Sequence, residues 1–229
     1  MGPTRRAHDL KLLLPFVSPT SGASEDMRTA LSNSLGSAKA GAILAVYEMT
    51  NPVASDTAGL RVATASAATA QTVLAAALLA PGIAALLAFP RNVTFTVAGG
   101  TAAEAPTSAL ITGTDIAGNA LTETVVITAS AGTYAGAKAF KTITSIVLSG
   151  GTGTGATVAI GFAKIFGLPA KVKDRAGRRA VIQEVLDGAL VTNGTFATPT
   201  TSPPYGSWSP STNPDGAHDY AVTYERDIA

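Results

Sequence analysis

The feature that most constrains the fold is a series of short segments in which apolar and polar residues alternate. Side chains alternate between the two faces of a strand, so this pattern is typical of half-buried β-strands. Turn-forming clusters separate the segments at spacings of about 8 to 12 residues, as in sandwiches and barrels. We therefore expect a mainly β protein, an antiparallel β-sandwich of the immunoglobulin-like or jelly-roll-like type. The segments are 92–97, 109–112, 121–128, 140–148 and 156–162.

A tight polar connection at 113–119 predicts a hairpin between two of these strands. Asp115, Gly118 and Asn119 supply residues that favour turn conformations. Asp115 and Glu123 could also face each other as a pair of carboxylates suited to acid–base chemistry. We favour the structural interpretation, in which Asp115 holds the turn and Glu123 lies on the solvent side of its strand.

Further strands are expected at 42–49, 59–63, 180–186 and 220–224. Residues 73–89 contain no charged side chain, but this stretch is shorter than the roughly 20 residues that span a bilayer. Pro81 and Gly82 sit in its middle, as a turn would. We predict a buried pair of short elements there, with membrane contact as the less favoured alternative.

Two segments look like additions to the β domain. Residues 1–41 lack a sustained period, which predicts an extended N-terminal arm, and its apolar patch at 10–16 favours contact with a partner. Residues 198–216 hold five prolines and predict a surface strap, because proline is excluded from sheet interiors. The strap carries Trp208, which either touches a partner or folds back onto its own domain. The expected division is an arm at 1–41 and a β-sandwich domain at 42–229.

Composition narrows the classes of function. Only 14% of the residues are charged and the net charge is +1, so nothing draws the whole chain to nucleic acid or to an anionic membrane. The chain has no cysteine, and its histidines are His8 and His218, far apart in sequence. A surface poor in charge suits a protein covered by neighbours, although a compositional bias toward Ala and Thr explains it equally well.

Two local clusters need separate interpretations. The glycine-rich run at 150–155 lacks the Lys-Ser/Thr ending of a phosphate-binding loop, and a strand follows it, so a hairpin loop is favoured. Residues 171–179 hold five basic side chains and form either a solvated turn or a docking patch for an acidic protein surface. Nucleic acid is the least favoured partner for this patch, because no aromatic residues are interleaved.

No nucleophile, metal-binding or cofactor motif occurs in the chain. We therefore expect no enzyme activity, no metal and no cofactor. Arg5 and Arg6 do not open a convincing signal peptide, because Asp9 and Lys11 lie where an uninterrupted apolar segment would be needed. The expected place of synthesis is a cytoplasm, which the chain leaves only inside a larger particle.

The central segments resemble β-domain proteins encoded among the virion structural genes of tailed bacteriophages, often described as head decoration (cement) proteins. The resemblance covers about residues 90–169. It rests on Phe-Pro-Arg-Asn-Val-Thr at 89–94, Ile-Thr-Gly-Thr-Asp-Ile-Ala-Gly-Asn-Ala-Leu-Thr-Glu at 111–123, Gly-Ala-Lys-Ala-Phe-Lys-Thr-Ile-Thr-Ser-Ile at 136–146, Gly-Phe at 161–162 and Gly-Leu-Pro at 167–169.

This resemblance implies a capsid-stabilising protein on the virion surface. Its partners would be the major capsid protein and other copies of itself, as trimers or dimers, without nucleic acid or membrane. The expected partner contacts are Leu12, Leu13, Leu14, Phe16, Lys171, Lys173, Arg175, Arg178, Arg179, Tyr205 and Trp208. The alternatives are a tail, fibre or adhesin-like binding module, which would use Tyr205, Trp208 and Tyr220, and, less favoured, a glycan-active enzyme of sandwich fold.

Overall fold

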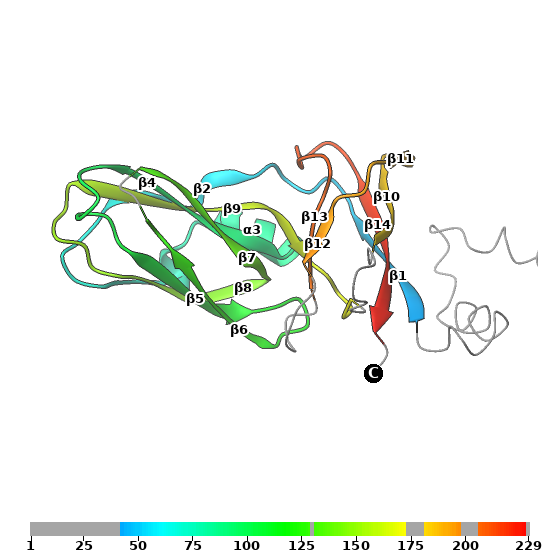
Figure 1. Ribbon diagram of the computed structural model, residues 1–229, viewed down its shortest axis with the longest axis horizontal. Helices are drawn as coiled ribbons and strands as arrows, with labels where there is room; N and C mark the ends of the chain where they lie inside the picture. The colour runs from blue at the N-terminus through cyan, green and yellow to red at the C-terminus, as the bar shows by residue number, and fades with distance from the viewer. Residues whose placement is uncertain (1–41, 129–130, 173–180, 198–205, 228–229) are drawn as a thin grey trace, which may run out of the picture.

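The computed structural model describes residues 42–128, 131–172, 181–197 and 206–227 (Figure 1). These residues form a mainly β protein with several antiparallel sheets, one of them a curled half-barrel. The mainly β class expected from the alternating segments is therefore confirmed. The predicted arm at 1–41 lies outside the described residues.

One four-stranded sheet, which we call the hairpin sheet, combines a hairpin of two consecutive strands with two strands from elsewhere in the chain. Its strand order is β3-β8-β5-β6. β5 and β6 form the predicted hairpin, and the buried Ile143, Ile146 and Leu148 of β8 are anchors that the alternation had indicated. The strands are β3 (Gln71–Leu74), β8 (Thr142–Leu148), β5 (Ser108–Thr114) and β6 (Ala120–Val126).

The largest sheet has six strands in the order β12-β13-β9-β4-β7, with β2 also pairing with β9. The expectation that 92–97 is half-buried is wrong for the first part of that strand. Every residue from Arg91 to Phe95 is buried, because β4 lies between β9 and β7 and both of its faces are covered there. The strands are β12 (Thr195–Ala197), β13 (Ser207–Ser209), β9 (Ala156–Gly167), β4 (Arg91–Gly99), β7 (Gly132–Phe140) and β2 (Asp56–Ala65).

The other four-stranded sheet, which we call the terminal sheet, joins the two ends of the described chain in the order β1-β14-β10-β11. β1 pairs with β14 along its whole length. β10 and β11 are joined by Asp187 and Gly188, whose φ values of 48° and 80° fit a two-residue hairpin turn. The strands are β1 (Ala42–Met49), β14 (Tyr220–Asp227), β10 (Val181–Leu186) and β11 (Ala189–Val191).

Among the described residues, the buried side chains form two hydrophobic cores. The core of the large lobe is mostly aliphatic and lies between the hairpin sheet, helix α3 (Ala80–Ala88) and the strands β2, β4 and β9. The core of the small lobe is rich in aromatic rings, and the terminal sheet packs there against the β12-β13-β9 end of the six-stranded sheet. Figure 1 shows the two lobes side by side, with the long strand β9 running from one toward the other.

The charge-free stretch at 73–89 forms short elements, as predicted, but two details of the prediction were wrong. Pro81 and Gly82 lie in the first turn of α3, where proline is favoured, and they do not form a turn between elements. The stretch is also only partly buried, since Leu74 and Leu87 are exposed. Within the described residues, no helix is long and apolar enough to cross a membrane.

Two connections also differ from expectation. The glycine-rich run at 150–155 links β8 to β9, which belong to different sheets, so it is not a hairpin loop. The proline-rich segment is not wholly a surface strap, because Ser207–Ser209 forms β13 inside the six-stranded sheet. The prolines of this segment flank β13 and leave its backbone free to pair.

Candidate functional site

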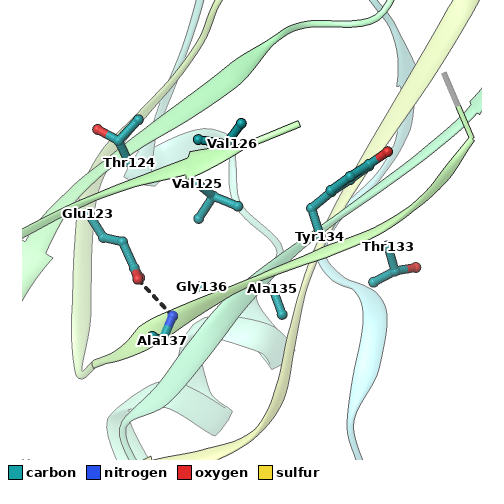
Figure 2. A pocket seen from close by; sticks show the side chains of 9 residues that line it. All are labelled: Glu123, Thr124, Val125, Val126, Thr133, Tyr134, Ala135, Gly136 and Ala137. Carbon is teal, nitrogen blue, oxygen red and sulfur yellow. Dashed lines mark hydrogen bonds between the residues drawn. The ribbon is translucent and has the colours of Figure 1, made fainter. Parts of the chain in front are cut away.

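A groove between two strand edges is the first candidate site. β6 ends the hairpin sheet and β7 ends the six-stranded sheet, and the two strands lie beside each other without pairing. The groove between them, which we call the seam, has a volume of about 400 Å³. Its walls are residues 123–126 of β6 and 133–137 of β7 (Figure 2).

Glu123 closes one end of the seam. Its carboxylate accepts hydrogen bonds from the backbone N–H of Ala137, at 2.7 Å, and from that of Lys138, at 3.2 Å. The prediction that Glu123 lies on the solvent side was wrong. Residues two apart share a face of a strand, so Glu123 points inward with Leu121 and Val125, and its carboxylate reaches β7 at the open edge (Figure 2).

The N–H groups that Glu123 binds are available because β7 bulges there. The pairing of β4 with β7 steps from Asn92↔Ala139 to Thr94↔Ala135, so extra residues of β7 are left unpaired between these points. A side chain at Gly136 would overlap the carboxylate of Glu123. On the β4 side, the Nδ2 group of Asn92 donates to the carbonyl oxygen of Gly136 at 2.7 Å. The bulge is therefore held from two sides by side chains of two sheets.

Asp115 has the turn-holding role that was predicted for it. Its Oδ1 accepts hydrogen bonds from the backbone N–H groups of Ala117 and Asn119, each at 2.9 Å, and its Oδ2 accepts from the Asn119 side chain. Glu123 is engaged with β7, so each carboxylate is committed to its own set of backbone donors. The described geometry gives no support to a paired-carboxylate site.

The second candidate surface is the outward face of the hairpin sheet, which we call the outer face. The inward residues of these strands belong to the core of the large lobe, so the alternate residues point away from it. Leu110 is 41% exposed, Leu74 59% and Val126 64%. No side chain on the outer face is charged. Its residues are Thr72, Leu74, Ser108, Leu110, Thr112, Thr114, Ala120, Thr122, Thr124, Val126, Thr142, Ser145 and Val147.

Trp208 is not available as a partner contact. The side chain is completely buried, and its ring lies 6.1 Å from that of Phe166 and 6.5 Å from that of Tyr220. Of the two interpretations left open for Trp208, the structure supports the one in which it folds back into its own domain. β13 carries it there, between Phe196 of β12 and Phe166 of β9.

The other predicted contacts are for the most part outside the described residues. Lys171 is described and is half-buried, next to the buried Val172. The remaining contacts predicted for the arm, the basic segment and the strap lie outside the described residues: Leu12, Leu13, Leu14, Phe16, Lys173, Arg175, Arg178, Arg179 and Tyr205. For these, the sequence-based assignment stays a prediction.

The glycine-rich connection at 150–155 receives a carboxylate of its own chain. Glu104 accepts hydrogen bonds from the N–H of Thr101 at 2.7 Å and from that of Gly155 at 3.2 Å. The Thr101 backbone N–H and hydroxyl, followed by Gly155, hold the pKa of Glu104 below its ordinary value. The glycine-rich connection therefore binds a carboxylate of its own chain.

Sequence reasoning missed two buried charged residues: Arg91, which lies over Phe162 of one core and Phe166 of the other, and Glu184 in the small lobe. Arg91 donates from Nε to the carbonyl of Ala163 and from a terminal nitrogen to that of Val53, both at 2.6 Å, and burial lowers its pKa to about 10. Glu184 is fully buried and accepts from the Gly194 N–H and from both the N–H and the hydroxyl of Ser211. Their partners are backbone and hydroxyl groups 10 to 72 residues away in the sequence, so no local pattern could have revealed them.

His218 lies at the exposed rim of the small lobe. Its Nδ1 is 2.6 Å from Asp215, and its Nε2 is 3.6 Å from Asp187. Among the described residues, no group of three or more His, Asp or Glu side chains has an arrangement that could hold a metal ion. The cluster therefore connects the β10–β11 turn to the segment before β14.

Comparison with known proteins found no family model, no curated protein and no solved structure that matches this chain.

Proposed function

We propose that this chain is a virion structural protein that binds the outside of a tailed-phage head and stabilises contacts between major capsid subunits. The observation that carries the proposal is the outer face of the hairpin sheet. Ordinary protein surfaces have roughly a quarter or more of their positions charged, whereas this face has none and exposes Leu74, Leu110 and Val126. Such a face suits coverage by another protein.

The resemblance at residues 90–169 supports the same class of function. It spans β4 to β9, which include β5, β6 and β8 of the hairpin sheet but not β3, and we assign the large lobe to the antiparallel β-sandwich class. Each contact can be weak, because a particle repeats its subunits and repetition supplies avidity. In this proposal the chain works without catalysis, cofactor, nucleic acid or membrane, and further copies of it, as trimers or dimers, share the capsid surface.

The alternative of a glycan-binding tail or fibre module receives no specific support. Two of its three candidate aromatic residues, Trp208 and Tyr220, are buried in the small lobe. Glycan recognition by stacking needs exposed rings. Tyr205 lies outside the described residues.

The test uses heads purified from a phage in which the gene for this chain has been deleted. Purified full-length chain is added, and co-sedimentation and the temperature of DNA release are measured. The double variant Leu74→Lys/Leu110→Lys places two charges on the outer face. The control Leu190→Lys changes a residue that is 71% exposed on the terminal sheet.

We expect the wild type and Leu190→Lys to sediment with the heads and to raise the release temperature, while the double variant stays in the supernatant. Circular dichroism must show that all three are folded. Wild-type chain that does not bind heads would overturn the proposed function. Equal binding by all three would support a protein that binds heads, but would show that its contact surface is not the outer face.

A further inference from the structure

The seam is bordered by backbone groups that no strand of the described chain uses. The N–H of Ile127 donates to the carbonyl of Thr107 at 2.9 Å, which fixes the alternation of hydrogen bonds between β6 and β5. In that alternation Thr124 and Val126 direct their N–H and C=O groups away from β5 and toward β7. β6 has no strand partner on that side among the residues that the structure describes.

Thr122, the neighbouring position of β6 whose backbone faces the same way as that of Thr124, confirms that these groups point away from β5. The carbonyl of Thr122 also points away from β5, and it accepts a hydrogen bond from Nζ of Lys138 at 2.8 Å. Lys138 and Glu123 thus close the seam at one end by reaching across it in opposite directions. The open part is the stretch beside Thr124 and Val126, over the side chains of Val125 and Tyr134 (Figure 2).

An extended segment is the ligand that fits this geometry. A strand added to a free edge makes main-chain hydrogen bonds, and every second side chain points toward the same face. Val125 is buried and Tyr134 packs against the core of the large lobe, so the inward side chains of such a segment should be apolar. The walls of the seam are otherwise small residues and backbone.

The chain itself contains a segment with this pattern. Leu10, Leu12, Leu14 and Phe16 follow one another at intervals of two, with Lys11, Leu13 and Pro15 between them. From Phe16 to Ala42, where the described chain begins, the linking residues can extend about 80 Å at 3.3 Å each. The radius of gyration of a globular chain of about 190 residues is roughly 16 Å, so the segment can reach the seam of its own molecule.

We propose that, in the free protein, residues 10–16 occupy the seam of their own chain as an added strand on β6, with Leu12 and Leu14 pointing inward. A tethered segment has an effective concentration of the order of millimolar, which favours its own chain over a second copy. The inference does not depend on the proposed function, because it concerns the protein away from any particle.

The experiment is amide hydrogen exchange of the full-length chain, read residue by residue by NMR at two protein concentrations. Leu12→Asp places a carboxylate on the inward face of the segment. Leu13→Asp is the matched control, since it adds the same charge one residue away, on the opposite face. The informative amides are those of Thr124 and Val126, because β5 does not bind them.

We expect exchange at Thr124 and Val126 to be at least about tenfold faster in Leu12→Asp than in wild type and in Leu13→Asp, at both concentrations. Fast exchange of these amides in the wild type would overturn the proposal. So would an equal effect of both substitutions, because the alternating register would then be wrong. Protection that grows with concentration, together with a dimer in light scattering, would assign the seam to a second copy and also overturn it.

Discussion

The hairpin sheet and the terminal sheet have the same number of strands but are built in different ways. Each contains one hairpin, β5–β6 and β10–β11, but the hairpin sheet extends its hairpin with β8 and β3 and packs aliphatic side chains into the large lobe. The terminal sheet pairs β1 with β14, which lie at opposite ends of the described chain, and packs aromatic rings. In the small lobe, the buried Glu184 carboxylate accepts from the Ser211 N–H, and the Tyr220 hydroxyl donates to the carbonyl of Asn213.

Their outward faces differ as well. The outer face of the hairpin sheet has no charged residue, whereas the corresponding face of the terminal sheet carries Glu48 and Glu225. An antiparallel sheet packs one face on its core and can leave the other exposed, so the difference between the two sheets lies in the side chains that their exposed faces carry. In the proposed function the large lobe provides the contact surface, while the small lobe pairs the two ends of the described chain.

Of the substitutions that distinguish the two lobes, Trp208→Ala should have the largest effect on stability. The substitution removes a completely buried ring from the small lobe and should lower the free energy of unfolding by about 3–5 kcal/mol. Hydrogen exchange should show lost protection in β10 and β14, with β5 and β8 still protected. Equal loss of protection in both lobes, at low denaturant, would mean that the two cores are one cooperative unit.

A smaller effect is expected for Glu184→Gln. The carboxylate accepts three hydrogen bonds, and the amide nitrogen would face donors that it cannot accept from. We expect a loss of about 1–3 kcal/mol in urea unfolding. Glu48→Gln is the control, because Glu48 is exposed on β1 and its substitution should change stability by less than about 0.5 kcal/mol. Similar losses in both variants would contradict the claim that the buried Glu184 carboxylate stabilises the fold through its hydrogen bonds.

Alkaline pH should separate the two lobes. Burial raises the pKa of Tyr224 to about 12 and that of Tyr47 further still, and both belong to the small lobe. Because the folded state favours the protonated phenols, their contribution to stability is complete below pH 10 and is lost as the pH rises above it. Hydrogen exchange between pH 9 and 11, corrected for intrinsic rates, should show that the terminal sheet loses protection before the hairpin sheet. The opposite order would contradict this account.

The smallest effect concerns the rim of the small lobe. Hydrogen bonds from the Ala217 N–H and from His218 lower the pKa of Asp215 from 3.8. A depressed carboxyl pKa stabilises the folded state above about pH 4 and ceases to do so as the pH falls through the folded value. The difference in melting temperature between wild type and Asp215→Asn should therefore be small at pH 7 and shrink further below pH 4. A constant difference would show that ionisation of Asp215 contributes nothing.

How far the sequence predicted this fold depends on which lobe is considered. Strands of the large lobe were visible because their alternation is local and their turns contain Asp115 and Gly118. Helix α3 was missed because its residues are apolar all around and Pro81 was taken for a turn. The small lobe was seen only in part: its longer strands were indicated, but β11, β12 and β13 have three residues each.

The candidate sites were less visible than the strands. The seam arises where two sheets end side by side, which depends on tertiary pairing, and Glu123 was placed on the wrong face of its strand. Asp187-Gly188 is a dipeptide that favours a two-residue hairpin turn. The pattern of strands alone does not predict the β10–β11 hairpin that it forms. Trp208 shows that a proline-rich context does not by itself place a residue at the surface, because β13 lies inside the six-stranded sheet.

The most direct test of the central claim is a cryo-electron microscopy reconstruction of heads decorated with the full-length chain. This account predicts that the outer face of the hairpin sheet, with Leu74, Leu110 and Val126, is covered by protein, while Glu48 on the terminal sheet faces solvent. Density that covers the terminal sheet and leaves the outer face of the hairpin sheet open would contradict it. So would heads on which the chain has no fixed position.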